Sequence, residues 1–187
     1  MRAVIRGLDA FLRYLYGVQP FTQEENCILR IQVSRTSHSL YMPDKVVEKG
    51  QKVIFLHLWN ERIPTLPSNG ADFGWANRIR RRLMHSLRLL AEHIQNNAQL
   101  VDVQAIGAVT VLLMPGDSFA QRLGFSLLPY RNPLGQFGEF WENFYSWWLM
   151  WAYNVVTLRQ KRLLNLRRME MWISMEAFLK RYASLNG

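Results

Sequence analysis

The stretch of the chain with the most chemically capable side chains runs from His57 to Arg62 (HLWNER). It follows an almost wholly apolar segment, and sites are often built where a buried strand gives way to a loop. His57 could act as a general base or contact a phosphate, Asn60 could donate a hydrogen bond, and Glu61 could supply a carboxylate. Together with Arg78, these residues form our candidate ligand site. The structural alternative is that His57 is a core histidine, while Asn60 and Glu61 cap a turn or pair with arginines.

Other catalytic and metal-binding classes lack their motifs. The four histidines show no HxH, HxxxH or HExxH spacing, and Cys27 is the single cysteine. There is no GxSxG, and no serine has an acid and a histidine nearby in a known pattern. The phosphate loops GxxxxGK[ST] and GxGxxG do not occur either. The sequence therefore identifies no catalytic residue, metal or cofactor, and it favours a role other than catalysis.

The run from Arg78 to Arg82 holds four arginines, which could follow the phosphates of a nucleic acid. Consecutive helical residues point around the whole helix, so at least one arginine must turn toward the protein, where Glu61 or Asp72 could pair with it. No helix-turn-helix, zinc-finger, RRM or KH signature accompanies the run. We expect a solvated, ion-paired face, and we do not expect nucleic acid as the partner.

Aromatic side chains are concentrated between residues 137 and 153, and cationic side chains follow them up to residue 168. There are too many rings for one helical stripe, so some must face outward, a partner or a lipid headgroup layer. Basic residues beside such rings could engage anionic lipids. The expected contact residues are Trp147, Trp148, Trp151, Arg159, Arg162, Arg167 and Arg168. The alternative is that this segment covers the open face of the sheet as core.

The overall charge suggests the class of partner and the cysteine count suggests the compartment. The formal net charge of +9 favours anionic partners such as a membrane surface or a phosphorylated molecule. A single cysteine cannot form an internal disulfide, and charged residues interrupt any signal-like N-terminal stretch. The longest apolar run, residues 144–156, covers about 13 residues, whereas a membrane-spanning helix needs ~20. We expect a cytoplasmic protein, with peripheral attachment to the inner membrane face as the open alternative.

Hydrophobic periodicity predicts the elements. Helices are expected over residues 2–16, 73–96 and 118–123, and strands over 27–35, 39–42, 52–59, 103–113 and 124–129. Asp72 is the expected N-cap of the long helix. The remainder, from 137 to about 185, is expected to be helical. This order predicts an α/β or α+β fold with a mainly antiparallel sheet, divided into a core domain, 1–133, and a helical C-terminal extension, 134–187, packed on it.

Two stretches carry a family resemblance. The run from Gly50 to Glu61 (GQKVIFLHLWNE), followed by an arginine-rich helix and then by Ala120–Phe125 (AQRLGF), resembles the YkoP-like domain of bacteria over residues 28–130. Such domains occur alone or beside envelope-polysaccharide enzymes such as deacetylases. The resemblance implies an accessory or binding protein, associated with the membrane surface or with an envelope-biosynthesis protein, and transfers no catalytic residue.

Ala120–Phe125 is also similar to a short stretch near the end of acyl-CoA N-acetyltransferases. The pyrophosphate loop of those enzymes, R/Q-x-x-G-x-G/A, has no counterpart here, because neither Gly107 nor Gly116 supplies it. The alternative function is therefore an enzyme or ligand-binding domain with a site around His57, Asn60 and Glu61 but without a coenzyme A loop.

Overall fold

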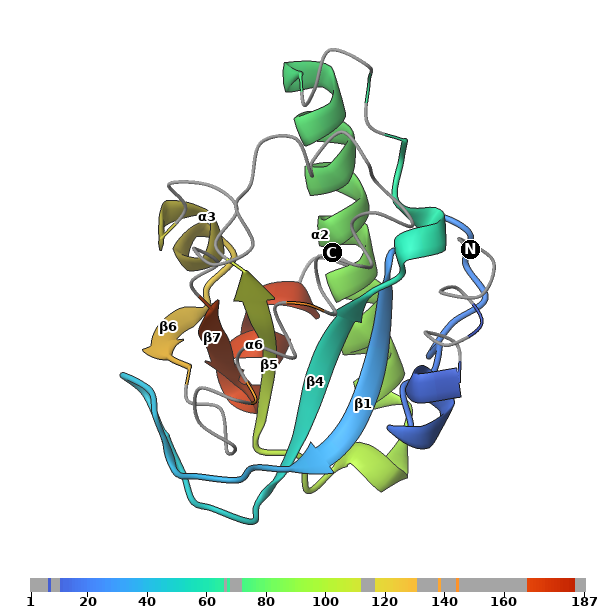
Figure 1. The fold of residues 1–187 in the computed structure, drawn as a ribbon. Coiled ribbons are helices and arrows are strands. Elements are labelled where there is room, and N and C mark those ends of the chain that lie inside the picture. The colour runs from blue at the N-terminus through green and yellow to red at the C-terminus, as the bar shows by residue number, and fades with distance from the viewer. Residues whose placement is uncertain are drawn as a thin grey trace.

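A five-stranded sheet in the order β1-β4-β5-β7-β6 forms the centre of the molecule (Figure 1). The computed structural model describes residues 7, 11–65, 67, 72–111, 117–130, 138, 144 and 168–183. The strands are β1 (Leu29–Arg35), β4 (Lys52–Leu58), β5 (Ala105–Val111), β6 (Ser126–Pro129) and β7 (Arg168–Ser174). Only the β4–β5 pair is parallel, and the other pairs are antiparallel. The predicted α+β fold with a mainly antiparallel sheet is confirmed.

The helices and short elements follow the predicted order closely. They are η1 (Asn60–Arg62), α2 (Phe73–Gln95), η2 (Ala98–Leu100), α3 (Asp117–Arg122) and α6 (Met175–Tyr182), with a small hairpin of β2 (Leu40–Tyr41) and β3 (Val46–Val47). Residues 11–15 are also helical. Figure 1 shows α2 and α6 on the same side of the sheet, and α2 extending past the strands at its N-terminal end.

Local chemistry explains where α2 begins and which way it faces. The Asp72 carboxylate accepts a hydrogen bond from the Trp75 backbone nitrogen at 2.6 Å, as expected of an N-cap residue. Leu87, Leu90 and Ile94 recur at helical spacing and are buried against the sheet. The predicted N-cap of this helix is therefore confirmed, and its second half packs an apolar stripe against the sheet.

The two faces of the sheet are covered differently. One face packs its aliphatic side chains against α2 and α6 in the main core, including Ile31, Leu56, Ile106 and Ile173 with Leu87 and Phe178. On the other face, a smaller cluster contains strand residues Val53, Ala105 and Trp172 together with Leu40, Met42 and Val47 from the β2–β3 region. The alternation of side chains along each strand produces this division.

Gly107 and Trp172 make a close contact on the second face. The two residues are opposite each other in the β5–β7 pair. A Cβ atom added at Gly107 would lie 2.3 Å from Cε3 of Trp172 and 2.7 Å from the Met171 carbonyl oxygen. No side chain fits in that space, so the indole packs directly on the β5 backbone.

The expected helix across residues 168–174 is wrong, because that segment is β7, an interior strand between β5 and β6. Met169, Met171 and Ile173 alternate with Glu170, Trp172 and Ser174, which is the period of a strand. Pairing with strands on both sides overrides the helical propensity of the methionines. The helical expectation holds for α6, and the expected helices between 134 and 167 lie outside the described residues.

None of the helices in the described ranges combines the length and the apolar composition needed to cross a bilayer.

Candidate functional site at the end of strand β4

Strands β4 and β5 run side by side over only part of their length. Their parallel pairing consists of Val53 with Ala105, Ile54 with Ile106, and Phe55 with Gly107. Both strands continue beyond these pairs, and Figure 1 shows them diverging toward the end at which α2 begins. No pair of described residues extends the ladder into this region. In open sheets, ligands bind beyond the carboxyl ends of parallel strands.

The backbone of β4 directs polar groups into the region where the strands part. Trp59 donates its backbone N–H to Ile28 at 2.8 Å, whereas the Lys52 carbonyl accepts from Gln104 at 2.9 Å. Successive residues of a strand present their N–H and C=O groups to opposite neighbours. The N–H and C=O of Leu58 therefore point toward β5, and this residue is 53% exposed.

Two guanidinium groups lie against the Trp59 ring just after β4. The Cζ atoms of Arg30 and Arg62 are 4.2 Å and 3.5 Å from the centroid of its ring. Each such cation–π contact contributes about 0.5–1 kcal/mol at a partly exposed site. The contacts hold both arginines beside the end of β4.

Glu61 joins this cluster to the N-terminal helix. Its carboxylate accepts two hydrogen bonds from Arg13, at 3.0 and 3.3 Å, and lies 3.6 Å from Arg30. Burial alone would raise the pKa of Glu61, but the hydrogen bonds and the nearby positive charges outweigh it and hold the pKa below its usual value. Glu61 is therefore ionised at neutral pH.

Further contacts connect η1 to the first half of α2. Arg62 donates to the Glu24 carbonyl at 2.6 Å, and Arg82 donates to the Arg62 carbonyl at 2.9 Å. Trp75 donates its indole N–H to the Pro64 carbonyl at 2.9 Å. We define the arginine–tryptophan cluster as Arg13, Arg30, Trp59, Glu61, Arg62 and Arg82. Two of its guanidinium groups, those of Arg13 and Arg30, lie beside the Glu61 carboxylate, and the other two contact Trp59 or backbone carbonyls.

His57 lies on the second face of the sheet, directly across the β1–β4 pair from Arg30. Its Nε2 is 3.0 Å from the side-chain oxygen of Gln32, so Nε2 carries the proton and Nδ1 keeps its lone pair. Burial lowers the pKa of His57, because the surroundings disfavour the charged ring. The imidazole is neutral at pH 7, which suits a hydrogen-bond acceptor or a base.

The four predicted site residues lie on three different elements. Asn60 and Glu61 lie in η1, His57 lies on β4, and Arg78 is an exposed residue of α2. Within the described ranges, no hydrogen bond or ion pair joins His57, Glu61 and Arg78 to each other. Their assignment as a ligand site stays a prediction.

The expected ion pairing of the α2 arginines differs from the observed one. Glu61 pairs with Arg13 and Arg30 instead, and Asp72 caps the helix. Arg82 is an arginine that turns inward, but its partner is a backbone carbonyl. Among the residues that the structure describes, no carboxylate pairs with the remaining α2 arginines, Arg78, Arg80, Arg81 and Arg88.

Sequence reasoning missed most of the arginine–tryptophan cluster. Arg30 precedes Ile31 in a strand whose alternation was visible, so its position on the second face was predictable. The proximity of Arg13 to Glu61 had no local signal, because the two residues belong to elements far apart in the chain.

The predicted membrane-contact residues fall almost wholly outside the described part of the chain. Trp147, Trp148, Trp151, Arg159, Arg162 and Arg167 lie there, and Arg168 begins β7, where it pairs with Val111. In the described ranges no three histidine, cysteine or acidic side chains gather to hold a metal ion.

Comparison with known families gives one match. The family model of the YkoP domain matches residues 1–182, which confirms the resemblance found in the sequence and extends it over β7 and α6. No curated protein and no solved structure gives a significant match to the chain.

Proposed function

This chain belongs to the YkoP domain family, and we propose that it binds a small anionic ligand, with an extended polar arm, at the end of β4. The parting of the parallel strands β4 and β5 after Phe55 and Gly107 is the observation that carries the proposal. It supports a binding role for the region around His57, Asn60 and Glu61.

An extended arm suits the parted strands. Strand edges that are not paired with each other offer rows of N–H and C=O groups, and extended ligands bind by pairing with such edges. Leu58 supplies one donor and one acceptor on the β4 side. A ligand with amide groups could form hydrogen bonds with the backbone N–H and C=O of Leu58, which face the region where β4 and β5 are not paired.

An anionic group suits the surrounding charge. Among the described residues of the arginine–tryptophan cluster, four arginines accompany one carboxylate, that of Glu61. Arg78 adds a further cation, because it lies one turn before Arg82 and therefore on the same side of α2. Guanidinium groups bind phosphates and carboxylates through paired, charge-assisted hydrogen bonds.

Coenzyme A is the probe that combines both features, since it carries an amide-containing arm and a pyrophosphate. The Ala120–Phe125 stretch, which is similar to one in acyl-CoA N-acetyltransferases, ends α3 and leads into β6. The glycine-rich pyrophosphate loop is missing from the sequence, and Asp72 places a negative charge at the start of α2. The chain therefore lacks the loop with which those enzymes hold the pyrophosphate of coenzyme A, so we propose binding of the ligand and no acetyl transfer.

Calorimetric titration of the full chain with coenzyme A and with inorganic pyrophosphate tests the proposal. Coenzyme A should bind, and more tightly than pyrophosphate, because only it has the arm. Arg78→Gln should raise the Kd about tenfold, the usual size of one lost charge-assisted contact. Arg88→Gln removes the same charge about 15 Å further along α2 and should leave the Kd nearly unchanged.

Three results would overturn the proposal. Coenzyme A and pyrophosphate could both fail to bind. Pyrophosphate could bind as tightly as coenzyme A, so that the strand edges contribute nothing. Arg78→Gln and Arg88→Gln could weaken binding equally, which would indicate attraction to the overall positive charge rather than a site.

The accessory role at the membrane surface or in envelope biosynthesis stays a separate prediction. Co-sedimentation with anionic liposomes tests it, comparing the chain with a variant in which the three tryptophans are replaced by alanine and the four arginines by serine. These residues are Trp147, Trp148, Trp151, Arg159, Arg162, Arg167 and Arg168. Equal sedimentation of the two proteins would contradict a membrane contact through these side chains.

A further inference from the structure

A serine, a histidine and a buried glutamate form a second constellation, independent of the end of β4. Ser37 Oγ lies 3.1 Å from His38 Nδ1, and His38 Nε2 lies 3.4 Å from Glu170 Oε2. We propose that Ser37 is a nucleophile toward activated esters, with His38 as its general base and Glu170 as the residue that positions the histidine. Nucleophilic serines are recognised by this geometry and not by their order in the chain.

Glu170 is suited to its role by burial. Its side chain is only 5% exposed, and its Oε2 also accepts a hydrogen bond from the Trp172 indole at 2.7 Å. A buried carboxylate needs a partner of opposite charge or strong donors. Formation of an imidazolium at His38 would provide that charge, so the glutamate favours transfer of a proton to the histidine.

The positions of the protons follow from the two contacts. A neutral histidine carries one ring proton, and here it belongs on Nε2, where it faces Glu170. Nδ1 is then the acceptor for the Ser37 hydroxyl. Ser37 is exposed and His38 is 43% exposed, so a reagent can approach the serine from solvent while the acid stays buried.

The segment that carries Ser37 and His38 is anchored by its neighbours. Thr36 is buried, its hydroxyl contacts both the backbone nitrogen and the carbonyl of His38, and its backbone nitrogen donates to Gln51 at 3.0 Å. Leu40, two residues after His38, packs in the small cluster with Trp172. These contacts hold the histidine near Glu170.

The reaction with an activated ester balances as follows. The Ser37 oxygen attacks the acyl carbon, its proton moves to His38 Nδ1, and a new O–C bond forms as the bond to the leaving oxygen breaks. The proton on His38 passes to the leaving group. Water then attacks the acyl-serine by the same route, which releases the acid and restores the serine. A fluorophosphonate stops at the first stage, because an O–P bond replaces the P–F bond and fluoride leaves.

Labelling of the full chain with a fluorophosphonate, mapped by mass spectrometry, tests the proposal. One adduct should form at Ser37, and His38→Ala should slow its formation about 100-fold, within the usual range for a lost general base. Ser39→Ala is the matched control, because that hydroxyl binds Glu48 instead of a histidine and its loss should leave labelling unchanged.

A test of the role of Glu170 must distinguish a slower reaction at Ser37 from a loss of folding. Glu170→Gln keeps an acceptor for the Trp172 indole, and circular dichroism shows whether it folds. Labelling at Ser37 should be slower in this variant, and Glu170→Asp, which keeps a carboxylate, should recover part of the lost rate. No adduct at Ser37, or an adduct whose rate is unchanged by His38→Ala, would overturn the proposal even if Glu170→Gln fails to fold.

Discussion

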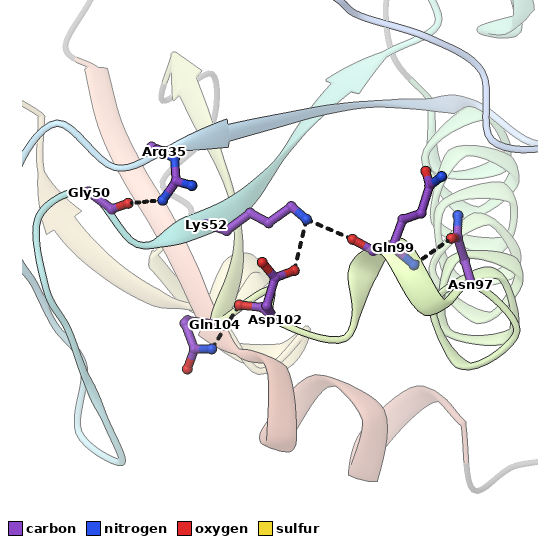
Figure 2. A network of polar contacts seen from close by, with 7 residues as sticks. All are labelled: Arg35, Gly50, Lys52, Asn97, Gln99, Asp102 and Gln104. Atoms are coloured by element: carbon purple, nitrogen blue, oxygen red, sulfur yellow. Dashed lines mark hydrogen bonds and ion pairs between the residues drawn. The ribbon is translucent and has the colours of Figure 1, made fainter.

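The two ends of β4 differ in their polar contacts and in their pairing with β5. We call the start of the strand, at Lys52, its closed end, and its last residue, Leu58, its open end. At its start, Lys52 donates to the Gln99 carbonyl at 2.7 Å and to Asp102 at 2.8 Å, while Gln104 donates to the Asp102 carbonyl at 2.8 Å (Figure 2). The Lys52 carbonyl in turn accepts from the Gln104 backbone. The Lys52 ammonium is paired with the Asp102 carboxylate, and the nearby Arg35 donates to the Gly50 carbonyl at 2.7 Å. The strand is thereby tied to the segment that leads into β5.

At its other end, β4 is no longer paired with β5. The described residues of the arginine–tryptophan cluster there include four arginines and one glutamate. Arg30 and Arg62 lie against Trp59, and Glu61 is shared between Arg13 and Arg30. A matched pair stabilises a fold without attracting a ligand, whereas excess charge beside unpaired strand edges attracts one. This contrast supports our proposal that the start of β4 serves stability and its end serves binding.

The largest effect should come from the residue at which the β4–β5 ladder ends. Gly107→Ala places a methyl group where the Trp172 ring lies, so we expect the free energy of unfolding to fall by about 3 kcal/mol. Urea denaturation measures this loss. Gly74→Ala is the control, because its new Cβ meets only ordinary contacts in α2, and helix propensity should make it neutral or stabilising. Equal stability of Gly107→Ala and the native chain would contradict the packing described.

A smaller effect is expected from Glu61→Gln at the open end. The loss should be about 0.5–1 kcal/mol, because a carboxylate that is 39% exposed is screened by solvent. The pKa of Glu61 is lower in the folded than in the unfolded chain, so its contribution is present above about pH 4.5 and disappears as the pH falls through the folded value. Urea denaturation should show a larger difference at pH 7 than at pH 3. The exposed Glu25→Gln should change neither result.

His57 should make the stability of the folded chain sensitive to mild acid. Burial lowers its pKa in the folded chain, so below about pH 6.5 the unfolded chain binds a proton that the folded chain does not. Stability should therefore fall as the pH drops below 6.5, and less steeply in His57→Gln. Thermal unfolding between pH 7.5 and pH 5.5 measures the slope. An equal change of slope in His85→Gln would show that the effect is not specific to His57.

The smallest effect is expected at the closed end. The hydrogen bond from Lys52 lowers the pKa of Asp102, so Lys52→Met should raise that pKa toward its ordinary value. An NMR titration of the Asp102 carboxyl group measures the change, and Lys49→Met should not produce it. Because the Asp102 side chain is exposed, the unfolding free energy should respond less than it does to Glu61→Gln.

Helices and strands that are marked by the pattern of neighbouring residues were predictable from the sequence. Contacts between segments far apart in the chain were not. The apolar run of β4 and the Asp72 cap of α2 can be read from neighbouring residues, and both are confirmed. The alternation in β7 was present but is short, and it lies beside a segment whose composition favours helix, so it was misread. That error also concealed the approach of Glu170 to His38, which depends on β7 entering the sheet.

The elements that hold the candidate site residues were predictable, but the contacts of these residues were not. The polar residues after the strand lie in η1 and on β4, and whether they bind a ligand stays a prediction. Their partners, Arg13 and Gln32, come from other elements, and no pattern in the sequence links them to Glu61 and His57.

The amide signals of the two ends of β4 test the central claim most directly. In a ¹H–¹⁵N spectrum recorded during titration with coenzyme A, the Leu58 amide should shift progressively, because its N–H faces the parted strands. The Lys52 amide should stay in place, since it lies at the closed end. A spectrum in which Leu58 does not move, or in which Lys52 moves as much, would contradict a binding site at the open end of this strand.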